Sequence, residues 1–314
     1  MIEREIESTW AVVLNWNGGE SNLACIRSLV GEGLSPERIV FVDNASSDGS
    51  RELVLRTFPG LDSITNERNL GYGHGTNRGI ERALAQGAAL VLLVNNDVTL
   101  SPGALGRLVA AREEEPRSGI LGPRIVFASD PALLWAAGGR ITFRRNMSTL
   151  LGHRRKDGPR YRRTREVDYV PGCAMLVRRE VFEAVGLLEG AYFAYHEDVE
   201  FCLRARERGF PTLLAGEALA LHDAHHSTGG GYNVHRKYMM GVNTIWFLRR
   251  NGTPGRWASF VLFDVCTLPF AYVLRALRGE GAAVIAKARG IRDGLRGERV
   301  SEERLRELGR FGDA

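Results

Sequence analysis

The first hundred residues alternate short apolar runs with amphipathic segments. Runs rich in β-branched residues predict four strands, at residues 10–14, 38–42, 63–65 and 90–94. Segments with helical spacing lie between them, at residues 21–30, 50–58 and 75–86. This alternation predicts an α/β fold, with a mostly parallel, Rossmann-like sheet flanked by helices. Because ligands bind beyond the carboxyl ends of such strands, the loops that follow them are the first candidates for a site.

The second half departs from this pattern. A strand is predicted at residues 173–177 and a helix at residues 198–208, and the chain is almost continuously apolar from residue 257 to 277. That stretch is long enough to cross a bilayer, but Asp264 and Pro269 interrupt it. We therefore expect one α/β domain at residues 1–250 and a helical, amphipathic and basic extension at residues 251–314.

Two interpretations of the extension stay open. In the first, it lies on a membrane surface and turns basic side chains toward anionic headgroups. These side chains are Arg275, Arg278, Lys287, Arg289, Arg292 and Arg296. In the second, its helices cap the first domain or join two protomers.

A basic stretch at residues 140–165 also has two open interpretations. It is either a solvent-exposed loop, or a contact for anionic lipid or for a phosphate-bearing acceptor.

Composition narrows the class of protein. The 314 residues are 44% hydrophobic and carry a net charge of +5, which is ordinary for a globular protein, and nucleic acid is not an expected partner. The four cysteines lie far apart without a CxxC pair, which favours a reducing compartment over disulfides or zinc. The first apolar run is too short for a signal peptide, so we expect a cytoplasmic protein.

The first three loops contain candidates for binding a nucleotide. Asp43 stands at a strand end, where a carboxylate accepts hydrogen bonds from a nucleoside, whereas Asp48 and Ser50 suit a helix cap better. The loop at residues 66–79 is rich in glycine and precedes a predicted helix, whose positive end suits a diphosphate. A glycine-rich turn alone is a weak signal, and this one does not match the GxxxxGK[ST] phosphate loop.

Two further motifs suggest a metal site. Asp97 follows a buried strand, and Ser101 with Pro102 offers the next helix a better cap than Asp97 does. A hard divalent cation needs only one or two protein carboxylates when substrate phosphates complete its coordination. His222, followed by His225 and His226, ends another apolar strand, and neutral imidazole is a ligand for Mn-type ions.

The adjacent acids Glu197 and Asp198 begin a predicted helix among aromatic residues. Neighbouring residues at a helix start point in different directions, so only one of the two can face a cleft. Partial desolvation raises the pKa of such a carboxylate toward that of a useful base. The alternative is that both acids only complement the positive end of the helix.

Taken in order, these motifs resemble glycosyltransferase family 2. They are Asn15-Trp16-Asn17-Gly18, VDNASSDGS from Val42, the glycine-rich loop, Asn95-Asn96-Asp97, and HEDVEFCLRAR from His196. Their order and spacing look most like the rhamnosyltransferase-type branch, over roughly residues 8 to 250. The resemblance implies a GT-A fold, a nucleotide diphosphate sugar donor, a divalent cation (Mg²⁺ or Mn²⁺) and transfer with inversion.

The resemblance also assigns roles by position. Asp198 matches the catalytic base, with Glu197 beside it. Asp97 and His222 match the metal ligands, although Asn95 replaces the first acid of the usual DxD motif. Relatives often carry Arg-Asn where this chain has Val242-Asn243. The residues matched to nucleotide-sugar binding are Asn15, Asn17, Asp43, Asn69, Gly73, Asn77, Asn95 and Asn96.

These matches imply an inverting, metal-dependent hexosyltransferase in cell-surface polysaccharide or glycolipid assembly. Rhamnose is the first expectation for the sugar and a glycan or glycolipid hydroxyl for the acceptor. The enzyme is expected at the inner face of the cell membrane, and a homodimer is a further expectation. Two other classes of protein are alternatives. A nucleotidylyltransferase would need an arginine and a lysine around its first loop, and a non-catalytic scaffold would not need Asp97, Asp198 and His222.

Overall fold

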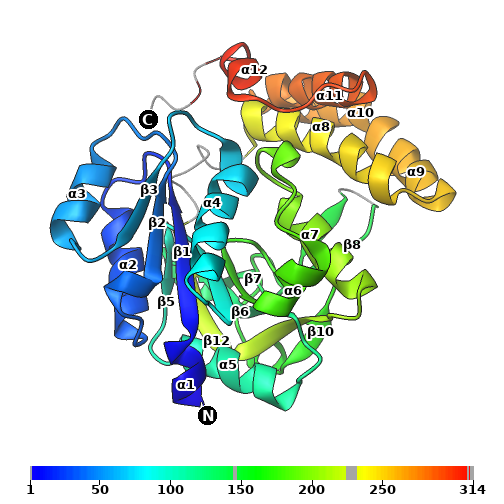
Figure 1. Cartoon of the computed structure of the whole chain (residues 1–314). Helices are drawn as coiled ribbons and strands as arrows, with labels where there is room; N and C mark the ends of the chain where they lie inside the picture. Colours follow the sequence, from blue (N-terminus) through cyan, green and yellow to red (C-terminus); the bar gives the residue numbers. More distant parts are fainter. Residues whose placement is uncertain (1, 144–146, 224–231, 310, 312–314) are drawn as a thin grey trace.

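A computed structural model describes the whole chain except residues 1, 144–146, 224–231, 310 and 312–314. Figure 1 shows a central sheet flanked by helices, with a layer of further helices at one end. The first four predicted strands are confirmed as β1 (Thr9–Asn15), β2 (Ile39–Asp43), β3 (Asp62–Thr65) and β4 (Leu90–Asn95). The α/β prediction is therefore confirmed.

The described strands form a ten-stranded sheet. Eight of them follow the order β10-β12-β6-β11-β4-β1-β2-β3, and in addition β5 pairs with β12 and β7 pairs with β6. The strands β1 to β4 run parallel, and β11 is inserted antiparallel between β4 and β6. The remaining bounds are β5 (Val98–Leu100), β6 (Ile120–Phe127), β7 (Asp130–Ala136), β10 (Arg165–Val167), β11 (Ala174–Arg178) and β12 (Thr212–His222). A separate hairpin joins β8 (Gly139–Ile141) to β9 (Ser148–Leu150).

Two apolar cores cover the two faces of the sheet, because successive strand side chains point in opposite directions. Val12 of β1 belongs to the core under α4 (Gly71–Ala85), whereas its neighbours Ala11 and Val13 belong to the core under α2 (Ser21–Gly31). The other helices of this domain are α1 (Ile2–Glu7), α3 (Ser50–Thr57), α5 (Ala104–Glu114), α6 (Arg179–Val185) and α7 (Glu197–Glu207).

The glycine-rich segment is a helix over most of its length, not the predicted loop. Helix α4 begins at Gly71, and its glycines face neighbouring elements. A Cβ atom on Gly79 would lie 2.4 Å from Val12, and one on Gly73 would lie 2.9 Å from the Cα of Gly190. These glycines let α4 approach the sheet and the segment Gly190–Tyr192 (η3) more closely than any other residue would allow.

The expected cap of α5 is also corrected. The N-cap residue is Gly103, not Ser101, and glycine has no side chain that could accept a hydrogen bond. The carboxylate of Glu32 accepts hydrogen bonds from the amide groups of Gly103 and Leu105 instead. Glu32, the residue directly after α2, thus satisfies two free amide groups at the start of α5.

The helical layer at the C-terminal end consists of α8 (Val234–Asn251), α9 (Pro254–Phe260), α10 (Leu268–Ala276), α11 (Gly281–Leu295) and α12 (Glu302–Arg306). A π-helical turn, Val261–Val265, joins α9 to α10. Helix α11 packs closely on α8, since glycines such as Gly241 and Gly290 allow their backbones to touch. Asp264, which interrupts the apolar stretch in the sequence, is buried and forms an ion pair with Lys287 of α11.

Candidate active site

The fully buried side chain of Asn15 organises the loops at the carboxyl ends of β1, β2 and β4. Its Nδ2 donates to Asp43 Oδ1 at 2.8 Å and to the hydroxyls of Ser46 and Ser50. Its Oδ1 accepts from Asn96 Nδ2 at 3.1 Å. Asn15 thus fixes Asp43 and Asn96, two of the residues expected to bind the donor, and has little surface of its own for a ligand.

A second amide network fixes the start of α4. Asn44 Oδ1 accepts from the amide of Leu70, Asn69 Oδ1 accepts from the amide of Gly71, and the carbonyl of Phe193 accepts from the amide of Tyr72. The protein itself therefore uses the first amide groups of this helix. A contact between this helix start and a diphosphate stays a prediction.

Two other residues assigned to the donor, Asn77 and Gly73, contact the segment that precedes Glu197 and Asp198. The side chain of Asn77 donates to the carbonyl of Leu188 and accepts from its amide, at 2.8 and 3.1 Å. Gly73 packs against Gly190. Asn17 adopts a φ of 51°, and its side chain accepts a hydrogen bond from the amide of Ser47. The roles of these residues in donor binding stay predictions.

Strand pairing brings Asp97 and His222 together although 125 residues separate them in the sequence. Their side chains are buried, and His222 Nε2 lies 3.3 Å from Asp97 Oδ1. The backbone supports this approach, because β5 pairs with the end of β12 and the amide of Asp223 donates to the carbonyl of Asp97. The ring of Trp135 packs edge-on against His222. His225 and His226 lie outside the described residues.

The side chains of Asp97 and His222 fit a divalent cation whose coordination shell a substrate completes. Neighbouring ligands of an octahedral Mg²⁺ lie about 3.0 Å apart, close to the separation of these two atoms. Asn95 Oδ1, at the end of β4, is buried and has no hydrogen-bond partner among the described residues. No group of three or more His, Cys, Asp or Glu side chains gathers as a metal site in the described part of the chain. Asp97 and His222 would therefore leave most of the coordination to phosphate and water.

Glu197 and Asp198 begin α7 and have different surroundings. Asp198 accepts hydrogen bonds from the amide groups of Gly172 and Val199, at 3.0 and 2.8 Å. Glu197 Oε2 is buried without a partner among the described residues. Burial raises the pKa of both carboxyls, and the charge of Asp198 raises the pKa of Glu197 further. Because two amide donors stabilise its charged form, Asp198 is the member of the pair that ionises first.

The segment before these acids is strained and held in place. Phe193, Tyr195 and His196 all have positive φ, between 63° and 80°, which side chains other than glycine rarely adopt. The buried amide of Asn243 on α8 donates to three carbonyls in this region, those of Tyr192, Ala194 and Tyr195, at 2.8–2.9 Å. The strain is thus balanced by one side chain from a distant helix.

His196 is the second anchor of this segment. Its Nε2 lies 3.2 Å from the hydroxyl of Thr244, and burial lowers its pKa to about 3. A neutral imidazole is therefore packed beneath the acids, and it contributes no charge to them.

Cys173, directly before β11, lies near both carboxylate groups. Its thiol is buried, and after burial the largest influences that raise its pKa are the charges of Asp97 and Asp198. The carbonyl of Cys173 accepts from the amide of Asn95 at 3.0 Å. The segment Gly172–Cys173 therefore contacts Asp198 through an amide and the strand end before Asp97 through a carbonyl.

Sequence reasoning missed three residues of this site, which are Tyr72, Gly172 and Phe311. The hydroxyl of Tyr72 donates to the carbonyl of Gly172, whose amide holds Asp198. Phe311, near the C-terminus, packs against Trp16 and Phe193, with ring centroids 5.0 and 6.4 Å apart. Of these three, only Gly172 left a signal in the sequence, as part of the Pro171-Gly172 turn before a predicted strand.

The family model of glycosyl transferase family 2 matches residues 11–186. The N-acetylglucosaminyl-diphospho-decaprenol L-rhamnosyltransferase of Mycobacterium tuberculosis is 31% identical over 211 residues, which cover 62% of this chain and 69% of the relative. A hexosyltransferase of low-salt glycan biosynthesis from Haloferax volcanii is 26% identical over 196 residues, or 62% of this chain and 60% of that protein.

A solved structure shows the same fold. The mannosyltransferase of Pyrobaculum calidifontis in complex with GDP-Man and Mn²⁺ has a TM-score of 0.59 at 14% identity, over 93% of this chain and 88% of that chain. The predicted GT-A fold with a helical C-terminal region is confirmed.

Proposed function

The chain belongs to glycosyltransferase family 2 as a rhamnosyltransferase-like member, and on this premise we propose that it moves a sugar from a nucleotide diphosphate donor to an acceptor hydroxyl with inversion. Family membership makes it a glycosyltransferase, so the nucleotidylyltransferase and the scaffold are set aside. One observation carries the finer proposal. The short segment Gly172–Cys173 contacts both Asp198 and the strand end that leads to Asp97, which supports a base and a leaving-group site close to one another.

Asp198 is the proposed base. Its two amide donors hold the carboxylate in one orientation, and burial raises its pKa so that it accepts a proton more readily than an exposed aspartate. An acceptor hydroxyl that gives up its proton to Asp198 attacks the anomeric carbon from the face opposite the diphosphate. A single displacement of this kind inverts the configuration and needs no nucleophile from the enzyme.

Asp97 and His222 would hold the divalent cation. When bound there, Mg²⁺ or Mn²⁺ would supply positive charge that neutralises a departing diphosphate. Asp43, which Asn15 holds in position, would accept hydrogen bonds from the nucleoside. The mannosyltransferase of similar fold was solved with Mn²⁺ and a nucleotide sugar, which supports this assignment.

The proposed acceptor is a lipid-linked glycan, and the proposed sugar is rhamnose. The Mycobacterium relative is named for transfer of rhamnose to a sugar on a lipid diphosphate. In this chain, the helix at residues 254–276 is apolar and long enough to cross a membrane, with 11% of its most apolar window buried. We propose that this helix associates with the inner face of the membrane, where such an acceptor would be found.

A transfer assay with and without metal tests this function. Full-length protein is incubated with a panel of nucleotide sugars and a lipid-linked acceptor, in Mg²⁺, in Mn²⁺ and in excess chelator. We expect turnover with a deoxyhexose donor and metal, and at least about a hundredfold less in chelator or in Asp97→Asn. Full turnover in chelator would remove the metal from the mechanism, and no turnover with any donor would contradict the proposed activity.

A further inference from the structure

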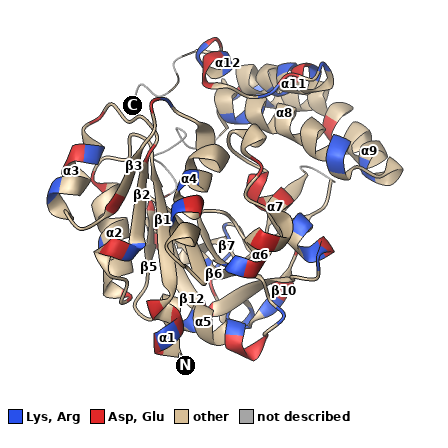
Figure 2. Cartoon of the chain, in the orientation of Figure 1, with Lys and Arg blue, Asp and Glu red and all other residues tan. Residues whose placement is uncertain are grey.

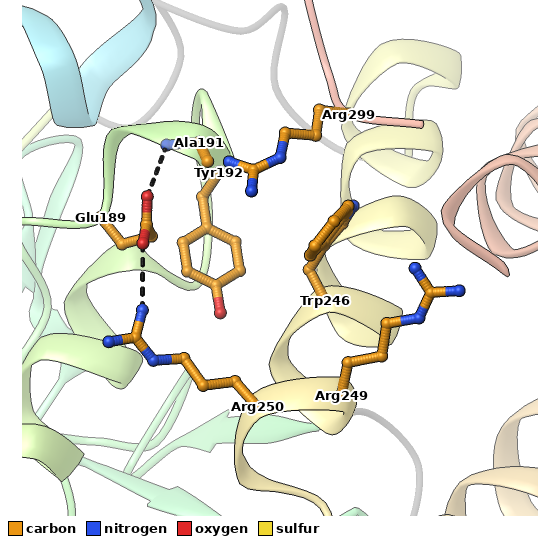
Figure 3. Close-up of a pocket in the computed structure, with 7 residues that line it drawn as sticks. All are labelled: Glu189, Ala191, Tyr192, Trp246, Arg249, Arg250 and Arg299. Atoms are coloured by element: carbon orange, nitrogen blue, oxygen red, sulfur yellow. Dashed lines mark hydrogen bonds and ion pairs between the residues drawn. The ribbon is translucent and has the colours of Figure 1, made fainter. Parts of the chain in front are cut away.

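A cavity of about 260 Å³ lies between the catalytic domain and the C-terminal helices, apart from the site described above. Figure 3 shows Tyr192 and Trp246 on its two sides, with Arg299 at one end and Arg250 at the other. The full lining is Glu189, Ala191, Tyr192, Trp246, Arg249, Arg250 and Arg299. Residues from η3, from α8 and from the segment after α11 thus converge on one space.

The charges of this cavity are not balanced. Arg250 pairs with Glu189 at 3.0 Å and with the buried Glu200 at 3.4 Å. Arg249 and Arg299 have no carboxylate partner among the described residues, and both guanidinium groups lie over the ring of Trp246, at 5.4 and 4.4 Å from its centroid. Trp246 is itself fixed, because its Nε1 donates to the carbonyl of Glu298. Two cations therefore line the cavity without a counter-ion among the residues that the structure describes.

We propose that this cavity binds the phosphate or diphosphate group of the acceptor, an inference that rests on the proposed function. Guanidinium groups bind phosphate through several charge-assisted hydrogen bonds. The arginines reach the cavity from different elements, which suits a tetrahedral anion with oxygens in several directions better than a planar carboxylate.

The position of the cavity supports an acceptor ligand. Tyr192 lines it and immediately precedes the strained segment that leads to Asp198. Arg250 lies four residues before Pro254, where the apolar helix begins. An acceptor whose lipid chain runs along this helix could place its phosphate in the cavity and its terminal sugar toward Asp198.

Pyrophosphate is the probe for this proposal. Full-length protein is titrated with it by calorimetry in chelator, so that no metal can recruit it to Asp97 and His222. We expect saturable binding, weakened at least about tenfold in Arg249→Ala/Arg299→Ala and abolished in Arg299→Glu. Arg296→Ala, an exposed arginine outside the cavity, is the matched control and should bind as the wild type does, as should Asp97→Asn. Absence of saturable binding, or equal affinity in the double variant, would overturn the proposal.

A second arm separates acceptor phosphate from membrane phosphate. Binding to phosphatidylglycerol vesicles should be the same for the double variant and the wild type. Loss of vesicle binding with unchanged pyrophosphate affinity would assign these arginines to the membrane surface and contradict the proposal. Because no transfer is measured, failure here leaves the glycosyltransferase assignment standing, and an inactive enzyme would not alter the pyrophosphate result.

Discussion

At the scale of single residues, the account depends on which member of the Glu197–Asp198 pair carries the charge. The two carboxyls are neighbours and burial raises both pKa values, so they resist ionising together. Only Asp198 receives amide hydrogen bonds from another segment, through Gly172. The structure therefore favours an ionised Asp198 beside a Glu197 that keeps its proton.

This assignment predicts a pH-dependent stability. The folded-state pKa of Glu197 lies above its unfolded value, so its contribution is complete below the unfolded pKa of about 4.3 and is lost as the pH rises toward the folded pKa. Glu197→Gln cannot ionise and should lose less stability between about pH 5 and about pH 8 than the wild type. Urea unfolding at both values measures the difference. An identical loss in the two proteins would show that Glu197 ionises normally in the fold.

Some of this site could be predicted from single residues and some could not. Asp97, His222 and Asp198 stand at strand or helix ends, where the local pattern marks them. Asn243 was noticed only as one position of a family motif, and its three hydrogen bonds reach residues about 50 positions away. A side chain that works by holding a distant backbone leaves no local pattern.

At the scale of elements, α4 shows how a glycine-rich sequence can serve packing. The sequence predicted a loop that cradles phosphate, because glycine spacing alone does not distinguish a flexible turn from a closely packed helix. The structure shows glycines facing β1 and η3, where a Cβ atom would collide. The helix thereby holds η3, and with it the strained segment that leads to the base.

A pair of glycine substitutions tests this role. In Gly73→Ala, the new Cβ would lie 2.9 Å from Gly190, so we expect a loss of about 1–3 kcal/mol in unfolding free energy. Gly106→Ala in α5 meets nothing within 4 Å and should stabilise by about 0.5–1 kcal/mol. Thermal and urea unfolding measure both. Normal stability with weakened donor binding in Gly73→Ala would support the original donor-contact assignment instead.

At the scale of the whole molecule, the packing of the C-terminal helices supports the capping interpretation, and the membrane interpretation stays a proposal. Helix α11 packs on α8, whose Asn243 holds the strained segment before Asp198, so the extension caps the first domain. Figure 2 shows acidic residues at the start of α7 and mixed charges on α11 and α12. Helix α10 has no buried residue and exposes large apolar side chains, among them Phe270 and Leu277 next to its end. Asp264 does not interrupt this surface, because it turns inward to Lys287.

We expect this apolar surface to bind membranes. Phe270 and Leu277 are 69% and 82% exposed, and burying each in lipid contributes about 1.5–3 kcal/mol. Phe270→Glu/Leu277→Glu should therefore lower sedimentation with anionic vesicles at least about tenfold. The control is Ile2→Glu/Val30→Glu, which changes exposed apolar residues of α1 and α2. Equal sedimentation of all three proteins would place the membrane contact elsewhere or remove it.

The most direct test of the whole account is sugar transfer by Asp198→Asn. The amide keeps the shape of the side chain but cannot accept the proton of the acceptor, and a positioned base contributes on the order of 10²–10⁴ in rate. We predict normal folding, donor affinity within about twofold of the wild type, and kcat at least about a hundredfold lower, with a smaller loss in Glu197→Gln. Near-normal kcat in Asp198→Asn would contradict the account, and abolished transfer in Glu197→Gln alone would move the base by one residue.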